Sequence, residues 1–268
     1  MSVQIRQDGT LTYLTADTLS GTIHCFSTRR GGVSTGVLES LNLGIHRGDA
    51  PENVEKNYEI LGRAVGFTPA QTVFTRQVHT DHVLRVGRAD CGCGLLRPQT
   101  QDCDGLITNE PGVALCCFSA DCTPILLFDP VRRAVAAIHS GWRGTALGIA
   151  KTAVEAMTRE FGTNPADLHA AIGPCISRCC FETDRDVPDA MRAALGADAA
   201  DAITDHHTGK YHVDLKVINR RWLLRAGLPA AQIDTAAQCT ACQPELFWSH
   251  RKTGAARGSL AGIIMLPE

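Results

Sequence analysis

Two histidines and one cysteine lie at the ends of apolar stretches of the chain, where a fold can present them for chemistry. His79 and His139 offer imidazole nitrogen, and Cys122 offers a thiolate. Pro124 and Gly141 follow closely after two of them, as is typical where a strand ends and a loop exposes functional groups. A catalytic zinc prefers these donor types and uses three protein ligands plus one open position. The three residues therefore fit a catalytic zinc site.

The spacing of these residues does not by itself identify a ligand set. Their separations match no generic zinc pattern, and the chain contains ten histidines and twelve cysteines from which other sets can be drawn. A single histidine or cysteine more often has a structural role than a role in metal binding. From residue types and spacing alone, a metal site and separate packing roles both remain open.

Twelve cysteines are many for a chain of 268 residues. The N-terminus lacks the apolar core and basic flank of a signal peptide, so we expect a cytoplasmic protein whose cysteines are free thiols or metal ligands rather than disulfides. Cys116 and Cys117 lie in an apolar run and are predicted to be small buried hydrophobic residues.

A further group of cysteines has no clear partners in the sequence. Cys239 and Cys242 form a C-x-x-C pair, which resembles a redox motif or half of a zinc site, but no partner pair accompanies it. Cys175, Cys179 and Cys180 have no pairing that the sequence supports. A second metal site or a disulfide at Cys239 and Cys242 therefore stays an alternative to two unpaired thiols.

Length and charge restrict the class of protein. The chain is at the upper end of what one α/β domain organises around a single core, and no linker or fixed-period repeat divides it. The net charge is -2 and no run of Lys and Arg is present, which argues against nucleic-acid and membrane partners. The longest apolar stretch, residues 113–118, is too short to span a bilayer. We expect one domain over residues 1–268.

The elements that must position the site are predicted from apolar periodicity and from Gly and Pro breaks. Strands are predicted over residues 22–28, 72–76, 82–86, 113–119, 125–128, 133–139, 168–172 and 261–266. Helices are predicted over residues 52–65, 145–161, 187–195 and 214–226. Several strands follow one another without an intervening helix, so the order favours an α+β fold, a single-domain mixed α/β sandwich, over a regular βαβ repeat.

The helix over residues 145–161 has the clearest pattern. Ile149, Ala153 and Met157 fall on one face, and Gly162 can end the helix. Arg143 stands just before its predicted N-terminus, and helix N-termini attract anions. Arg143 is therefore a candidate phosphate ligand, with an ion pair to a carboxylate as the alternative.

Two loop residues near the N-terminus are candidate substrate ligands. Arg29 lies in a Gly-rich break after a predicted strand, where its planar guanidinium can bind phosphate or occupy a surface turn. Asn42 can hydrogen-bond a ribose or a base, or cap a turn.

The C-terminal region offers another candidate group. His250 and Arg251 follow the aromatic pair Phe247 and Trp248. This mixture can stack a purine and hold an anion, or it can be a C-terminal packing motif.

Two aspartates can support the metal ligands. Asp121 directly precedes Cys122 and can orient a ligand by hydrogen bonding. Asp104 can act in the same way or end a strand.

Eight segments of the sequence, in this order, closely resemble the laccase-domain (YfiH-type) family, also described as multicopper polyphenol oxidase-like or purine nucleoside phosphorylase proteins. The resemblance covers nearly the whole chain from about residue 22. The segments are Ser27-Thr28-Arg29-Arg30-Gly31-Gly32-Val33-Ser34, Leu41-Asn42-Leu43-Gly44, Gln77-Val78-His79, Asp104-Gly105-Leu106-Ile107-Thr108, Asp121-Cys122-Thr123-Pro124, His139-Ser140-Gly141-Trp142-Arg143-Gly144-Thr145, Ile172-Gly173-Pro174 and Phe247-Trp248-Ser249-His250-Arg251.

The resemblance implies a metal site and a fold. The family's ligand positions correspond to His79, Cys122 and His139, which are all present and which we expect to be both the metal ligands and the catalytic residues. The implied metal is zinc, with copper as a possibility. One His-Cys-His triplet cannot assemble the four-site copper architecture of true multicopper oxidases. The implied fold is a mixed α/β sandwich of the YfiH-like type, in agreement with the order of the predicted elements.

The resemblance also implies activity on purine nucleosides. The expected reactions are phosphorolysis of adenosine, inosine, guanosine and methylthioadenosine, and hydrolytic deamination of adenosine. Deamination needs a nucleophilic water, and an open zinc site lowers the pKa of water to about 7. Phosphorolysis needs a held phosphate, for which Arg29 and Arg143 are the expected anion clamps and Asn42, His250 and Arg251 further substrate ligands. The expected partners are nucleosides and phosphate, with a monomer or a homodimer as the assembly.

Three other functions fit the same residues. A copper-dependent polyphenol oxidase would use the same site with a redox metal. A cysteine hydrolase, for example one acting on peptidoglycan precursors, would use Cys122 as the nucleophile and His79 or His139 as the base. A non-catalytic binding module would hold a structural zinc, but such a zinc normally has four ligands and the motifs supply three.

Overall fold

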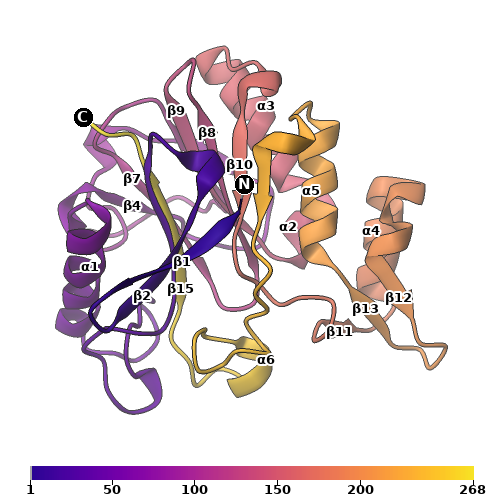
Figure 1. The fold of residues 1–268 in the computed structure, drawn as a ribbon, viewed down its shortest axis with the longest axis horizontal. Helices are drawn as coiled ribbons and strands as arrows, with labels where there is room; N and C mark the ends of the chain where they lie inside the picture. The colour runs from indigo at the N-terminus through magenta and orange to yellow at the C-terminus, as the bar shows by residue number, and fades with distance from the viewer. Residues whose placement is uncertain (1) are drawn as a thin grey trace.

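A computed structural model describes residues 2–268 of the chain. Two six-stranded sheets form the centre of the fold (Figure 1). The first sheet has the order β1 (Val3–Asp8), β2 (Leu11–Ala16), β3 (Ile23–Ser27), β15 (Leu260–Met265), β7 (Ala114–Ser119) and β4 (Thr72–Phe74). The second has the order β14 (Ile233–Thr235), β10 (His169–Ile172), β8 (Thr123–Asp129), β9 (Ala134–Ser140), β6 (Gly105–Thr108) and β5 (Val83–Arg85).

Six helices and a small third sheet complete the described chain. The helices are α1 (Pro51–Val65), α2 (Trp142–Leu147), α3 (Ile149–Phe161), α4 (Asp186–Leu195), α5 (Leu215–Arg225) and α6 (His250–Thr253). The third sheet has the order β11 (Glu182–Thr183), β13 (Tyr211–Val213) and β12 (Ile203–Asp205).

The central strands are apolar on both faces because each face meets another layer. In β8, Leu126 points into the core between the two sheets, whereas Ile125 and Leu127 face the opposite side, where α3 packs. All seven residues of β8 are buried, and so are all seven of β9. Continuous apolar runs of this kind are typical of strands covered on both sides.

Helices cover the outer faces of both sheets, which gives a four-layer α/β/β/α sandwich (Figure 1). Tyr58 and Leu61 of α1 pack on the first sheet against Cys25 and Cys116. On the second sheet, α3 and α5 form the matching layer, and α4 packs with the third sheet beyond them. The predicted mixed α/β sandwich is confirmed, and Cys116 and Cys117 are fully buried as predicted.

The prediction of one continuous helix over residues 145–161 is wrong. Residues 145–161 do not form a single helix, because Gly148 adopts a φ of 81° and separates α2 from α3. The left-handed conformation of a glycine ends one helix and lets the next begin at an angle. The break places Arg143 inside the first turn of α2 instead of ahead of a long helix.

The strands β1, β2, β6 and β14 and the third sheet were not predicted. β1 carries four exposed residues of six and pairs with only one neighbour, so its sequence lacks a buried face to detect. β15 lies between β3 and β7, so the C-terminal strand completes the sheet that the N-terminal strands begin.

Within residues 2–268, no helix combines the length and the apolar character needed to cross a membrane.

Candidate metal centre

The three predicted ligands lie together, although they come from separate parts of the chain. His79 follows β4, Cys122 lies in the turn between β7 and β8, and His139 is next to the end of β9. One ligand atom from each residue lies within 4.8 Å of those of the other two. The segments from β4 to β5 and from β7 to β8 both pass from the first sheet to the second, so the group stands where the chain crosses between the sheets.

The geometry of the group fits a metal ion with an open position. Zinc–nitrogen and zinc–sulfur bonds of about 2.0–2.1 Å and 2.3 Å place such ligands roughly 3.6 Å apart in a tetrahedron. Nε2 of His79 lies 3.9 Å from Sγ of Cys122, and the two imidazole rings are nearly perpendicular at 87°. His139 is buried, Cys122 is half-buried and His79 is exposed, so the fourth side faces solvent.

Asp104 fixes the orientation of His139. Nδ1 of His139 lies 2.7 Å from Oδ1 of Asp104, and both side chains are buried. Burial would raise the pKa of Asp104, but the hydrogen bond from His139 and the backbone N–H groups of the 78–80 loop hold it at about 2. An ionised carboxylate accepts hydrogen bonds only, so the proton of His139 is on Nδ1 and Nε2 presents its lone pair to a metal.

The same carboxylate shapes the loop that carries His79. The backbone N–H groups of Val78, His79 and Thr80 all donate to Asp104, at 3.1, 3.0 and 2.9 Å. His79 has a φ of 64°, a left-handed conformation that residues other than glycine seldom adopt. Three donated hydrogen bonds to one buried carboxylate offset that strain and aim the imidazole at Cys122.

Asp121 does the same for the cysteine ligand. Its φ is 91°, and its carboxylate accepts hydrogen bonds from the hydroxyl of Thr240 at 2.6 Å and the backbone N–H of Arg251 at 2.7 Å. Its carbonyl accepts from the backbone N–H of Ile176 at 3.0 Å. The turn that presents Cys122 is therefore held by two segments from the C-terminal half of the chain.

Gly141 is required by the close approach of the ligands. A Cβ at this position would lie 2.6 Å from Cδ2 of His79 and 3.3 Å from Sγ of Cys122. Any side chain here would push His79 away from the other two ligands. The glycine after His139 thus serves the metal centre directly.

Electrostatics favour the thiolate form of Cys122. Burial would raise the pKa of its thiol, but the charge and hydrogen bonding of His139, with a smaller contribution from His79, lower it to about 6. Burial would lower the pKa of His139, but the Cys122 thiolate and Asp104 raise it to about 9. A thiolate is the form of cysteine that binds metals and attacks electrophiles.

This thiolate predicts a difference between metal-free and metal-loaded protein. After removal of metal by a chelator, Cys122 is expected to react with iodoacetamide at pH 7 about two- to threefold faster than an ordinary thiol with a pKa near 8.5, because its larger thiolate fraction outweighs the lower nucleophilicity of a low-pKa thiolate. Added zinc should protect it, because the sulfur lone pairs are then used in coordination. Peptide mass spectrometry measures the rates, with buried Cys116 as the internal unreactive control. Fast alkylation in fully zinc-loaded protein would instead favour the cysteine hydrolase.

Two of the predicted substrate residues are engaged within the protein. The guanidinium of Arg29 lies 3.7 Å from the ring centre of Trp248 and donates to the carbonyls of Glu39 and Pro244. Asn42 is buried, and its amide donates to the Gly44 carbonyl and the Asp49 carboxylate while its oxygen accepts two backbone N–H groups. These bonds hold loops together, which is the turn role considered for both residues.

The aromatic rings of the C-terminal motif pack inside the protein and are not available to stack on a purine. Phe247 and Trp248 are 0% and 2% exposed, so neither ring is open to a purine, contrary to the stacking role considered for them. Arg251 donates from its guanidinium to the carbonyls of Cys180 and Glu182, both at 2.9 Å. His250 is exposed and its Nδ1 lies 3.5 Å from Nε of Arg257. His250 and Arg251 are the exposed polar residues of this motif, and the guanidinium of Arg251 is engaged by the two carbonyls.

Arg143 is exposed in the first turn of α2, which has six residues. Its guanidinium lies 4.3 Å from the ring centre of Trp142. Arg143 thus has an exposed side chain two residues beyond Gly141.

The sequence did not single out Arg257, which lies close enough to Cys122 to feel its charge, or Arg47, which influences Arg257. Burial lowers the pKa of Arg257 to about 10, and the charge of Arg47 lowers it further while Asp121 and Cys122 oppose the shift. Arg47 also lines a cavity of about 700 Å³ whose wall includes Gln77 and Phe118. Neither arginine lies in a recognisable anion-binding motif, so only the tertiary structure reveals them.

Comparison with known proteins places these features in a family. The model described as "Multi-copper polyphenol oxidoreductase laccase" matches residues 23–267. "Purine nucleoside phosphorylase YlmD" of Bacillus subtilis is 38% identical over 245 residues, covering 91% of this chain and 88% of that protein. "Purine nucleoside phosphorylase" of Bacteroides thetaiotaomicron is 35% identical over 258 residues, covering 96% of each. The crystal structure of the Bacillus licheniformis hypothetical protein YfiH has a TM-score of 0.93 at 35% identity and covers 98% of both chains.

Proposed function

The chain belongs to the multi-copper polyphenol oxidoreductase laccase family of YfiH-type proteins, and from that premise we propose that it is a zinc-dependent purine nucleoside phosphorylase. The proposed substrates are adenosine, inosine, guanosine and methylthioadenosine, with inorganic phosphate as the second substrate. The observation that carries the proposal is a three-ligand metal centre that is open on the side of His79. The names of its relatives support the choice of reaction.

The three donors fit a single zinc ion better than they fit a multicopper cluster. Two imidazoles and one thiolate are ligands that zinc accepts in catalytic sites. When bound by His79, Cys122 and His139, the metal supplies a Lewis acid at the open position. The donors that surround this position form a single His-Cys-His group, whereas a multicopper oxidase needs several copper sites.

Arg47 and Arg257 are the proposed phosphate ligands. Arg257 carries a half-buried positive charge that lies close enough to Arg47, Asp121 and Cys122 for all three to influence its pKa. An anionic ligand stabilises a cation that is partly removed from water. Arg47 continues into the cavity of about 700 Å³, where Phe118 offers a half-buried ring for the purine. This pair replaces Arg29, whose guanidinium is used by carbonyl groups.

The chain's own residues would then perform the phosphorolysis by positioning. The arginines hold phosphate so that one of its oxygens can attack C1′ of the ribose. The bond from C1′ to the purine nitrogen breaks, and its electron pair leaves with the base, which takes up a proton. The products are the free purine and ribose 1-phosphate, or 5-methylthioribose 1-phosphate when the substrate is methylthioadenosine. Deamination of adenosine, in which water attacks C6 and ammonia leaves, is the proposed second reaction of the same open centre.

Product analysis tests the proposed function. Metal-quantified protein is incubated with adenosine or inosine, with and without phosphate, and the products are separated by chromatography. We expect phosphate-dependent formation of adenine or hypoxanthine with ribose 1-phosphate, loss of activity after chelation and recovery on adding zinc. No product from any purine nucleoside by zinc-loaded protein would refute the proposal and favour the hydrolase or oxidase.

Replacing Arg257 by glutamine is expected to raise the KM for phosphate by about tenfold or more, because a charge-assisted contact is worth about 1.5–3 kcal/mol. The KM for the nucleoside should change much less. Arg63→Gln, at an exposed position on α1, is the matched control and should leave both values unchanged. Initial rates over a range of phosphate concentrations give the answer, and an unchanged phosphate KM in Arg257→Gln would remove this residue from the anion site.

A further inference from the structure

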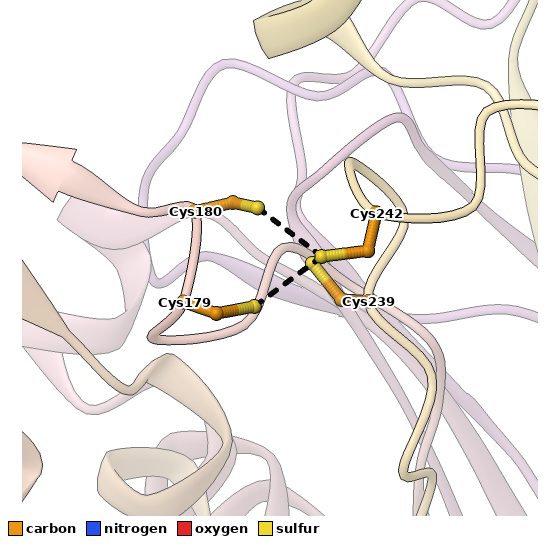
Figure 2. A group of neighbouring side chains, drawn as sticks. All are labelled: Cys179, Cys180, Cys239 and Cys242. Carbon is orange, nitrogen blue, oxygen red and sulfur yellow. Dashed lines mark hydrogen bonds between the residues drawn. The ribbon is translucent and has the colours of Figure 1, made fainter.

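A second cluster of potential metal ligands lies outside the His79–Cys122–His139 centre. Cys179 and Cys180 come from the loop between β10 and β11, and Cys239 and Cys242 come from the segment between β14 and α6 (Figure 2). Their four sulfur atoms all lie within 4.8 Å of one another. Figure 2 shows the side chains of Cys179 and Cys180 pointing from one loop toward the pair from the other.

The sulfur separations fit a tetrathiolate metal site. Four sulfurs at about 2.3 Å from a tetrahedral zinc lie roughly 3.8 Å apart. Sγ of Cys242 is 3.5 Å from Sγ of Cys179 and 3.3 Å from Sγ of Cys180. A disulfide requires about 2.05 Å, and all twelve cysteines of the chain, which lie within the described residues, are free.

The surroundings also suit a group of thiolates. The backbone N–H of Ser177 donates to Sγ of Cys239 at 3.3 Å. Nζ of Lys216, a 7% exposed ammonium, donates to the hydroxyl of the same Ser177 at 3.0 Å and otherwise only to two carbonyls. The lysine thus places a buried positive charge near the cluster, which offsets the negative charge of a zinc with four thiolates.

We propose that Cys179, Cys180, Cys239 and Cys242 bind one Zn²⁺ as a closed structural site. Four protein ligands leave no open position, in contrast to the three-ligand centre. The C-x-x-C pair is one half of the site, and the adjacent pair Cys179 and Cys180 is the half that the sequence did not connect to it.

The site would cross-link two segments that also meet through a few other contacts. These are the β-bridge between Cys175 and Cys239, the hydrogen bonds from the backbone N–H groups of Thr240 and Ser177 to Cys175 and Cys239, and a small apolar cluster that contains Ile176 and Ala241. A metal that cross-links such segments contributes its binding free energy to folding.

The cross-linked segments are connected to the His79–Cys122–His139 centre through Asp121, the residue before Cys122. They hold Asp121 through the backbone N–H of Ile176 and the hydroxyl of Thr240. Arg251, whose backbone N–H also donates to Asp121, anchors its guanidinium on the carbonyl of Cys180. The structural zinc would therefore stabilise the strained residue next to Cys122 without touching substrate.

Metal analysis of variants tests the site independently of activity. The wild-type protein, purified under reducing conditions, is expected to contain two zinc ions per chain. Cys179→Ser combined with Cys242→Ser should contain one zinc and unfold at a lower temperature. Both cysteines are exposed, so the change removes sulfur without leaving a core cavity. The matched control, Cys91→Ser combined with Cys93→Ser, alters two half-buried cysteines elsewhere and should keep both zinc ions.

Two further measurements keep the test decisive if the double variant folds poorly. Cys242→His alone should keep two zinc ions, since imidazole can replace a thiolate. Cobalt-substituted Cys122→Ser, in which the cluster is the proposed thiolate site that remains, should show an intense thiolate-to-cobalt charge-transfer band. A wild-type protein with one zinc per chain, a Cys179/Cys242 double variant with unchanged zinc, or disulfides among these cysteines in the reduced preparation would overturn the proposal.

Discussion

Replacement of Cys122 by alanine is expected to remove the metal from the His79–Cys122–His139 centre and to lower kcat/KM for phosphorolysis by about a thousandfold or more. Two imidazoles remain, but the charged ligand is lost, and with it the strongest donor of the group. The loss of a Lewis acid worth several kcal/mol corresponds to about three powers of ten in rate. The fold should survive, because Cys122 is half-buried and its sulfur has only the two histidines as close partners.

Zinc content and steady-state rates measured on the same preparation test this expectation. If the cysteine cluster holds its own zinc, the variant should keep one metal ion per chain and still show the fall of about a thousandfold or more in kcat/KM. Cys93→Ala is the matched control, since Cys93 is also half-buried and belongs to neither metal group. Full activity in zinc-depleted Cys122→Ala protein would contradict a metal-dependent reaction. Loss of activity with full zinc content would favour Cys122 as a nucleophile.

Local signals in the sequence favoured the three ligand candidates without identifying them as a set. Apolar runs end close to Cys122 and at His139, and a Gly or Pro follows each, so their places at strand ends can be read locally. Family motifs then connected them to His79. The sequence suggested that Asp104 can orient a ligand, but not that it accepts from five groups at once, because its partners are 24 to 35 residues away.

The substrate residues were harder to predict because burial depends on the packing of the sheets. Trp248 looks like a stacking residue in the sequence, yet it is 2% exposed and its indole N–H donates to the carbonyl of Leu41. Arg29 then lies over its ring. Conversely, Arg257 stands in a loop without any anion-binding motif, and only the approach of Arg47 and Cys122 marks it.

The cysteine cluster illustrates a contact that topology creates. Cys180 and Cys242 are separated by 62 residues, so no local pattern joins them. β10 and β14 are parallel neighbours in the second sheet, and the segments that follow parallel strands leave the same edge of the sheet. That pairing brings the two pairs of cysteines together. Sequence patterns do not show which strands are neighbours, so the cluster stayed invisible until the sheet order was known.

The substitution Asp104→Asn should have the second large effect, on metal affinity and on stability together. Oδ1 accepts from the His79 N–H and His139 Nδ1, and Oδ2 accepts from the N–H groups of Val78 and Thr80. Either orientation of an asparagine amide turns its NH₂ group toward such donors. Metal affinity should fall by about 10- to 100-fold, as for other groups that orient a ligating histidine. Unsatisfied buried donors at about 1–3 kcal/mol each should lower Tm by roughly 5–10 °C.

Asp129→Asn separates these two effects. Asp129 is also fully buried and accepts from the backbone N–H groups of Val131 and Arg132, but it lies at the far end of β8 from Cys122. The Asp129→Asn variant should be less stable than the wild type but should bind zinc with the same affinity. Calorimetric titration of metal-free protein with zinc, alongside thermal unfolding of both variants, makes the comparison. Equal zinc affinities in the two variants would reduce Asp104 to a purely structural carboxylate.

The pH dependence of the wild type gives a second way to recognise the role of Asp104. The pKa of Asp104 is about 2 in the folded chain, below its usual value near 3.8. A depressed pKa stabilises the fold fully above the unfolded value, and the contribution is lost as the pH falls through about 2. The carboxylate is therefore charged throughout the pH range in which zinc binds. The affinity lost in Asp104→Asn should accordingly be the same at pH 6.5 and at pH 8, whereas a defect caused by protonation of Cys122 would diminish as the pH rises.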